Sequence, residues 1–156
     1  MMTRLKYGAI AGFAATLAVS LLEVINLWLG PWFVSFPRLL SIMLGASDNL
    51  AIGWIAHFVA GTALLGTAFG LLCPRLPTDT VESKGILFAV GAWVLMMFTV
   101  APMAGLGIFA ARADFPTMIW MFVSHVVFGV VLGAVYGRLV ARSRHQQVPE
   151  GASVVR

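Results

Sequence analysis

The chain has 156 residues, of which 60% are hydrophobic and only 10% are charged. Soluble domains carry about 25% charged residues, so this composition and a mean hydropathy of +0.95 exclude a water-soluble fold. The single cysteine, Cys73, excludes an internal disulfide and a paired-cysteine metal site. The net charge of +4 does not predict nucleic-acid binding, because the basic residues lie just outside apolar runs. We expect an all-α integral membrane protein.

The first apolar run is predicted to cross the membrane over residues 7–29. Arg4 and Lys6 precede it, as in a signal peptide, but it exceeds the roughly 7–15 apolar residues of a signal core. We therefore expect a retained span. Its polar side chains recur at three- and four-residue steps, which places them along one inward side of a helix. They are Thr16, Ser20, Glu23 and Asn26.

Residues 30–49 form an apolar connection that Pro31 and Pro37 interrupt and that is too short to cross a bilayer. Its aromatic residues suit the headgroup boundary, and residues 36–44 are predicted to form a short interfacial helix on the membrane surface. A loop dipping into the interface is an equal alternative. Apolar connections of this kind also serve as lids over helix bundles.

Three further spans are predicted at 50–72, 85–109 and 116–138, which completes a four-helix bundle. A hydrophilic loop with two prolines separates the second span from the third. Pro102 is expected to kink the third span near its outer end. The basic tail, residues 139–156, is predicted to be disordered over its last ten or so residues.

The basic residues are distributed unequally between the two ends of the predicted bundle. Eight of the ten lysines and arginines lie in the N-terminal segment, the middle loop and the tail, whereas Arg38 and Arg112 lie on the other side. By the positive-inside rule, both termini and the middle loop are predicted to be cytoplasmic.

The second and fourth spans contain similar sequences, HFVAGTALLGTAFG from His57 and HVVFGVVLGAVYG from His125. Each histidine is followed four residues later by a glycine, Gly61 or Gly129. The first and third spans both begin with a lysine just before a glycine-rich segment. The pattern favours two repeated helical hairpins related by an axis along the membrane normal. Chance similarity between glycine-rich spans is the alternative.

Glu23, His57 and His125 are the only ionisable residues well inside the predicted spans. At about 1.5 Å rise per residue, all three fall in the outer third of the bundle. In one interpretation the histidines bond Glu23 or backbone carbonyls and fix helix register. In a second, the three residues ligate a metal, or the two histidines hold haem. In a third, Glu23 and a histidine carry protons or small solutes.

Methionines also recur in the third and fourth spans. Met96, Met103, Met118 and Met121 would suit a soft metal such as Cu(I), but methionine in a span usually only packs. The chain contains no nucleotide-binding loop, no serine elbow and no metalloprotease motif. Nothing in the sequence therefore favours a soluble-type enzyme.

Three segments carry a resemblance to a known group of proteins: GAIAGFAAT at 8–16, GWIAHFVAG at 53–61 and HVVFGVVLGAVYG at 125–137. The chain resembles small uncharacterised four-helix bacterial inner-membrane proteins, a family defined by a domain of unknown function. The resemblance covers most of the chain except the tail and implies a bacterial plasma-membrane location, but no activity. The spans of His57 and His125 also resemble those of haem-bearing respiratory subunits, although two histidines are too few to transfer a haem.

We expect a small multi-pass membrane protein of unknown activity that binds a metal or cofactor through Glu23, His57 and His125 in the outer half of the bundle. The alternative is a proton or small-solute transport module, or an accessory subunit of a larger membrane complex, with structural histidines. The expected partners are the lipid bilayer and, through the glycine-rich faces, a second copy or another membrane protein. Nucleic acid is not expected.

Overall fold

A computed structural model describes residues 1–30 and 32–145, without the side chain of His145. The described part is all-helical, without strands, as the composition predicted. Four of its helices are long and apolar enough to cross a membrane, and they are Met2–Leu29, Leu50–Arg75, Val81–Met103 and Phe115–Arg144. The elements in chain order are α1 (Met2–Leu29), α2 (Phe36–Met43), α3 (Leu50–Phe58), the π-helix η1 (Val59–Gly66), α4 (Thr67–Leu72), the 3-10 turn η2 (Cys73–Arg75), α5 (Val81–Phe98), α6 (Val100–Met103), the 3-10 turn η3 (Ile108–Ala110) and α7 (Phe115–His145).

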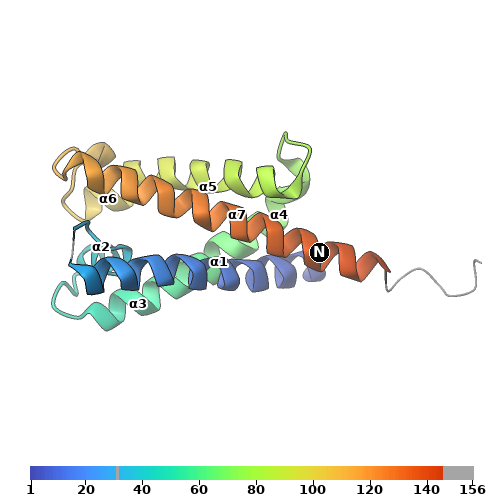
Figure 1. Ribbon diagram of the computed structural model, residues 1–156, viewed down its shortest axis with the longest axis horizontal. Helices are drawn as coiled ribbons and strands as arrows, with labels where there is room; N and C mark the ends of the chain where they lie inside the picture. The colour runs from blue at the N-terminus through green and yellow to red at the C-terminus, as the bar shows by residue number, and fades with distance from the viewer. Residues whose placement is uncertain (31, 146–156) are drawn as a thin grey trace, which may run out of the picture.

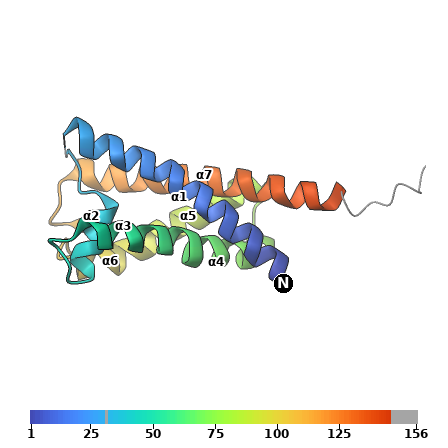
Figure 2. The same cartoon turned by 90° about the horizontal axis from the view of Figure 1, so that it is seen from below.

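At the end of the bundle that contains α2, α1 and α7 lie on one side and the second and third long helices on the other, and α1 runs obliquely so that its N-terminal part lies beside α4 (Figure 2). α5 packs along α7, whereas η1 and α4 pack along α1. The N-terminus and the end of α7 lie at one end of the bundle, and α2 and α6 lie at the other, which we call the α2 end (Figure 1). The second and third long helices meet where the ring of Phe69 on α4 contacts that of Phe88 on α5, with centroids 5.5 Å apart.

The first and second long helices form one hairpin, and the third and fourth form another. In each hairpin the two helices meet along a row of glycines, which we call the glycine seam. A Cβ placed on Gly12 of α1 would lie 2.6 Å from the Cα of Gly66, and one on Gly129 of α7 would lie 2.6 Å from the carbonyl oxygen of Gly85. Such distances require residues without side chains, which allow two helix backbones to approach closely. Both seams join helices of the same chain. The duplication and the self-association predicted from the glycines remain predictions.

The connection after α1 folds over the α2 end of the bundle. α2 buries one face, and the carbonyl of its Pro37 lies where a side chain at Gly53 of α3 would have to be. Its Leu39 is fully buried in one cluster with Met97 of α5 and Met121 of α7. The predicted helix therefore forms, and it is wedged between the second and third long helices as a lid. Its position at a membrane surface stays a prediction.

Hydrogen bonds hold the start of this lid. The side-chain amide of Asn26 donates to the carbonyl of Phe33 at 3.1 Å and accepts from the N–H of Phe33 at 3.3 Å. The N–H of Val34 donates to the hydroxyl of Thr117 on α7 at 3.4 Å. These bonds satisfy backbone groups that a buried loop would otherwise leave unpaired. Asn26, the last residue of the predicted polar stripe, thus positions the lid.

The third long helix ends earlier than predicted. It is interrupted at Thr99, with φ −119° and ψ −72°, one turn before Pro102. The proline ring clashes with the carbonyl four residues earlier and lacks an N–H, so the interruption has the predicted cause. The helix then ends with α6, and not at Phe109 as predicted, because Gly105 adopts a positive φ of 81° that turns the chain.

α7 is longer than predicted. It continues to His145, so the first residues of the predicted tail, 139–145, are helical, while the end of the predicted span at Arg138 stays a prediction. The segment contains leucine, alanine and arginine, which favour helix, and neither glycine nor proline. The expected disorder of the last residues falls on 146–156, which lie outside the described part of the chain.

Candidate functional site

Glu23 lies inside the bundle near the α2 end, with none of its surface exposed. Its Oε1 accepts a hydrogen bond from Nε1 of Trp120 on α7 at 3.2 Å. The Trp120 ring stacks on Phe33 of the lid segment, with centroids 5.1 Å apart and 16° between the planes. The other oxygen, Oε2, has no hydrogen-bond partner among the described residues. Glu23 therefore connects α1 to α7 beneath the lid.

His57 lies at the end of α3 and is 8% exposed. Its Nε2 is 3.2 Å from the hydroxyl oxygen of Ser20 on α1, so a hydrogen bond joins the first two long helices. The ring also meets Trp54 and Phe58 edge to face, at 5.8 Å in each case. One nitrogen of this imidazole is thus occupied within the protein, and the rest of the ring is held by aromatic packing.

His125 lies on α7, ten residues after the helix begins at Phe115. Its Nδ1 is 2.7 Å from the carbonyl oxygen of Met121. A carbonyl only accepts hydrogen bonds, so Nδ1 carries the proton and Nε2 of the neutral ring keeps a free lone pair. The ring of Phe36, at the start of α2, lies 5.1 Å from His125 and 6.2 Å from His57. Both histidines therefore lie beneath one residue of the lid.

A cavity of about 250 Å³ lies beside the two histidines. Its walls are mainly apolar, and its polar lining consists of His57, His125, Thr16, Thr99 and Ser124. Ser124 is 1% exposed, and its hydroxyl has no hydrogen-bond partner among the described residues. Unused hydrogen-bonding groups in an otherwise apolar pocket are typical of small-molecule sites.

The cavity lies in the space between the second and third long helices. Phe36 and Leu40 of the lid line it at the α2 end. Leu64 and Leu95, from the second and third long helices, also line it, yet they are 66% and 64% exposed. The cavity therefore opens sideways, through the flank of the bundle. Towards the other end, Phe69 and Phe88 bring the two helices together.

The π-helix η1 begins two residues after His57 and forms one wall of the cavity. Gly61 in η1 lies against the hydroxyl of Thr16 on α1, where no other side chain would fit. That hydroxyl donates to the carbonyl of Gly12 at 2.7 Å. π-helical turns are rare and are frequently found at functional sites. The glycine predicted to allow close approach below His57 does so, and it contacts the first helix.

The structure brings together two of the three predicted site residues. His57 and His125 line one cavity, whereas Glu23 is bonded to Trp120 and does not line it. The described residues include no group of three or more His, Cys, Asp or Glu side chains that could hold a metal ion. The three-ligand site remains a prediction.

Sequence reasoning missed Ser124, whose only signal was a polar side chain next to His125 within an apolar run.

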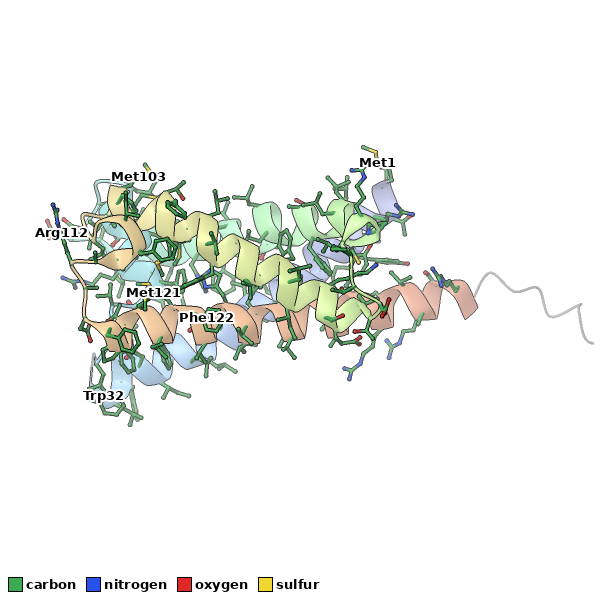
Figure 3. All side chains as sticks on the ribbon, turned by 90° about the horizontal axis from the view of Figure 1, so that it is seen from above. Met1, Trp32, Met103, Arg112, Met121 and Phe122 are labelled. Carbon is green, nitrogen blue, oxygen red and sulfur yellow. The ribbon has the colours of Figure 1, made fainter. Side chains whose placement is uncertain are left out.

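The methionines separate into inner and outer positions. Met103 on α6 is 67% exposed, whereas Met121 on α7 is fully buried inside the bundle (Figure 3). Met96 lines the cavity together with the histidines. Met103 is therefore an exposed residue that does not line the cavity.

Trp120→Phe is expected to lower the free energy of unfolding by about 1–3 kcal/mol, because it leaves a buried carboxyl group without its donor. Trp28→Phe is the matched control: Trp28 is 88% exposed, and its replacement should change the free energy by less than about 0.5 kcal/mol. Reversible denaturant titration in detergent micelles measures both. Equal effects of the two substitutions would show that the bond to Glu23 contributes nothing.

No curated protein and no solved structure matches the chain. Among protein families, residues 2–147 match DUF6789, a family of unknown function. The match covers nearly the whole chain, including all four long helices and both histidines of the cavity. The chain therefore belongs to the DUF6789 family of unknown function.

Proposed function

We propose that the protein is an integral membrane protein of the bacterial inner membrane, with both termini in the cytoplasm. Four long apolar helices support insertion, since about 20 apolar residues suffice to cross a bilayer. The excess of Lys and Arg at the end opposite α2 supports the orientation. In this orientation the α2 end, with the cavity beneath it, faces outward.

We further propose that the protein binds a small ligand in the cavity beside His57 and His125. The observation that carries this proposal is the cavity of about 250 Å³ with apolar walls and unused polar atoms. Nε2 of His125 offers a lone pair, and the hydroxyl of Ser124 offers a donor. A ligand with matching polar groups would form hydrogen bonds with both.

In this proposal Glu23 is a positioning residue and does not contact the ligand. It holds Trp120, and Trp120 in turn stacks on Phe33 of the lid segment. Phe36, three residues further on, contacts both imidazoles. The carboxyl group therefore acts on the site through the lid.

A metal or haem held by the two histidines is the second candidate. It is favoured by the contact of His125 Nδ1 with a backbone carbonyl, the arrangement that metal-binding histidines usually have. His57 would supply the second ligand nitrogen. Glu23 would become a ligand only after its hydrogen bond to Trp120 breaks.

Chemical analysis of the protein purified from its native membrane separates these candidates. We expect one small organic molecule per chain in the solvent extract, and none in the double variant His57→Phe/His125→Phe. A stoichiometric metal or a haem absorption band that disappears in the same variant would establish the second candidate instead. Wild-type protein with neither an organic ligand nor a metal would overturn both.

A further inference from the structure

The opening of the cavity lies about halfway along the length of the helix bundle. Leu64, at its opening, lies 14 residues after the start of the second long helix, Leu50–Arg75, and 11 before its end. At about 1.5 Å per residue, this position is more than 15 Å from either end of the helix. In a hydrocarbon core about 30 Å thick, the opening faces lipid chains and not water.

The ends of the cavity are closed. Phe36 and Leu40 cover it at the α2 end, and the contact of Phe69 with Phe88 joins its walls on the other side. A ligand thus reaches the histidines from the bilayer. A charged molecule would pay a large desolvation cost on this route, so the ligand is lipid-soluble and uncharged.

The unused polar groups specify the head of the ligand. His125 Nε2 can only accept a hydrogen bond while Nδ1 holds the proton. The hydroxyl of Ser124, 1% exposed and without a partner among the described residues, can donate. A hydroxyl group satisfies both, because it donates one hydrogen bond and accepts others. A ketone, an ester or an ether can accept a hydrogen bond from the serine but has no hydrogen to donate to the histidine.

Resting on the ligand-binding function proposed above, we infer that the ligand is a lipid-soluble alcohol or phenol. Its hydroxyl donates to Nε2 of His125 and accepts from Ser124. Its apolar body lies along Ala60 and Ala92, and its tail leaves between Leu64 and Leu95. A cavity of about 150 Å³ holds benzene, so the volume of about 250 Å³ accommodates a substituted ring.

Paired probes test the hydroxyl. The full chain in lipid nanodiscs is titrated with 4-hexylphenol and with its methyl ether, 4-hexylanisole, which has no donor. The phenol is expected to bind about tenfold more tightly, as the loss of a buried hydrogen bond predicts. In His125→Phe the preference should fall to about twofold or less, whereas His125→Gln, which keeps an acceptor, should retain it. Ser124→Ala removes a donor that the oxygen of either probe can use, so it should weaken the binding of both probes and leave the preference in place.

Ser143→Ala is the matched control for Ser124→Ala. Ser143 lies on the same helix, α7, outside the cavity, and its hydroxyl bonds the carbonyl of Val140 at 2.8 Å. Its replacement should leave the affinities of both probes unchanged. If wild type binds both probes equally, the hydroxyl inference is overturned and the ligand-binding function stands. If neither probe binds wild type, the ligand-binding function falls as well.

The sideways route has its own test. Leu64→Trp, at the opening, is expected to slow association of 4-hexylphenol at least tenfold while leaving its preference over the ether intact. Leu71→Trp on the same long helix, 40% exposed and not part of the cavity wall, should leave the association rate unchanged. An unchanged rate in Leu64→Trp would overturn access from the bilayer.

Discussion

Gly85→Val is expected to lower the free energy of unfolding by more than about 3 kcal/mol, at the upper end of the cost of overpacking. A Cβ at this position would overlap the carbonyl oxygen of Gly129 and lie 2.8 Å from the backbone nitrogen of Gly133. These neighbours are backbone atoms, so no side chain can move to make room. Only separation of α5 from α7 relieves the overlap, and this separation breaks the close backbone packing between the two helices.

Gly91 provides the matched control on the same helix. A Cβ there would meet nothing within 4 Å, so Gly91→Val should change the free energy of unfolding by less than about 0.5 kcal/mol. Denaturant titration in detergent, with size-exclusion profiles as a check on folding, compares the two variants. Similar stabilities of the two variants would contradict the glycine seam.

Leu39→Ala is expected to cost about 3 kcal/mol, within the range for removing a fully buried leucine. Leu39 has no exposed surface and lies in one apolar cluster with Met97 and Met121. The loss of these contacts loosens α2, and with α2 it loosens Phe36 over the two histidines. The backbone amides of α2 should therefore exchange hydrogen faster, while those of α5 remain protected.

Arg38 is the control for this experiment, since it is the preceding residue of α2 and is exposed. Arg38→Ala should change the stability by less than about 0.5 kcal/mol and leave the exchange of α2 unaltered. The lid would be refuted as a packed element if Leu39→Ala exchanged at the wild-type rate.

The sequence allowed the prediction of the elements whose cause is local. Apolar runs of about 20 residues predict four helices, and the structure has four of that kind. The spacing of Ser20, Glu23 and Asn26 predicted an inward stripe, and all three side chains are buried. Pro102 predicted the interruption of the third long helix. In each case residues close in sequence contain the physical reason.

The site depended on contacts between distant residues. Nothing around Glu23 indicates that its partner is Trp120, which is 97 residues away. Likewise, the cavity exists because α2 is wedged between the second and third long helices, and a hydropathy pattern cannot show which helices stay apart. Only the pairing of His57 with His125 was foreseeable, since both precede a glycine at the same spacing.

Native mass spectrometry of the wild type and of Ala92→Trp, purified side by side, measures ligand occupancy of the cavity most directly. Ala92 lines the cavity, so an indole at this position fills it, whereas Val94→Trp on the same helix is a control outside the cavity lining. The wild type and Val94→Trp are predicted to carry one small-molecule adduct per chain, and folded Ala92→Trp is predicted to carry none. The same adduct on all three proteins, or on none of them, would contradict a ligand site beside His57 and His125.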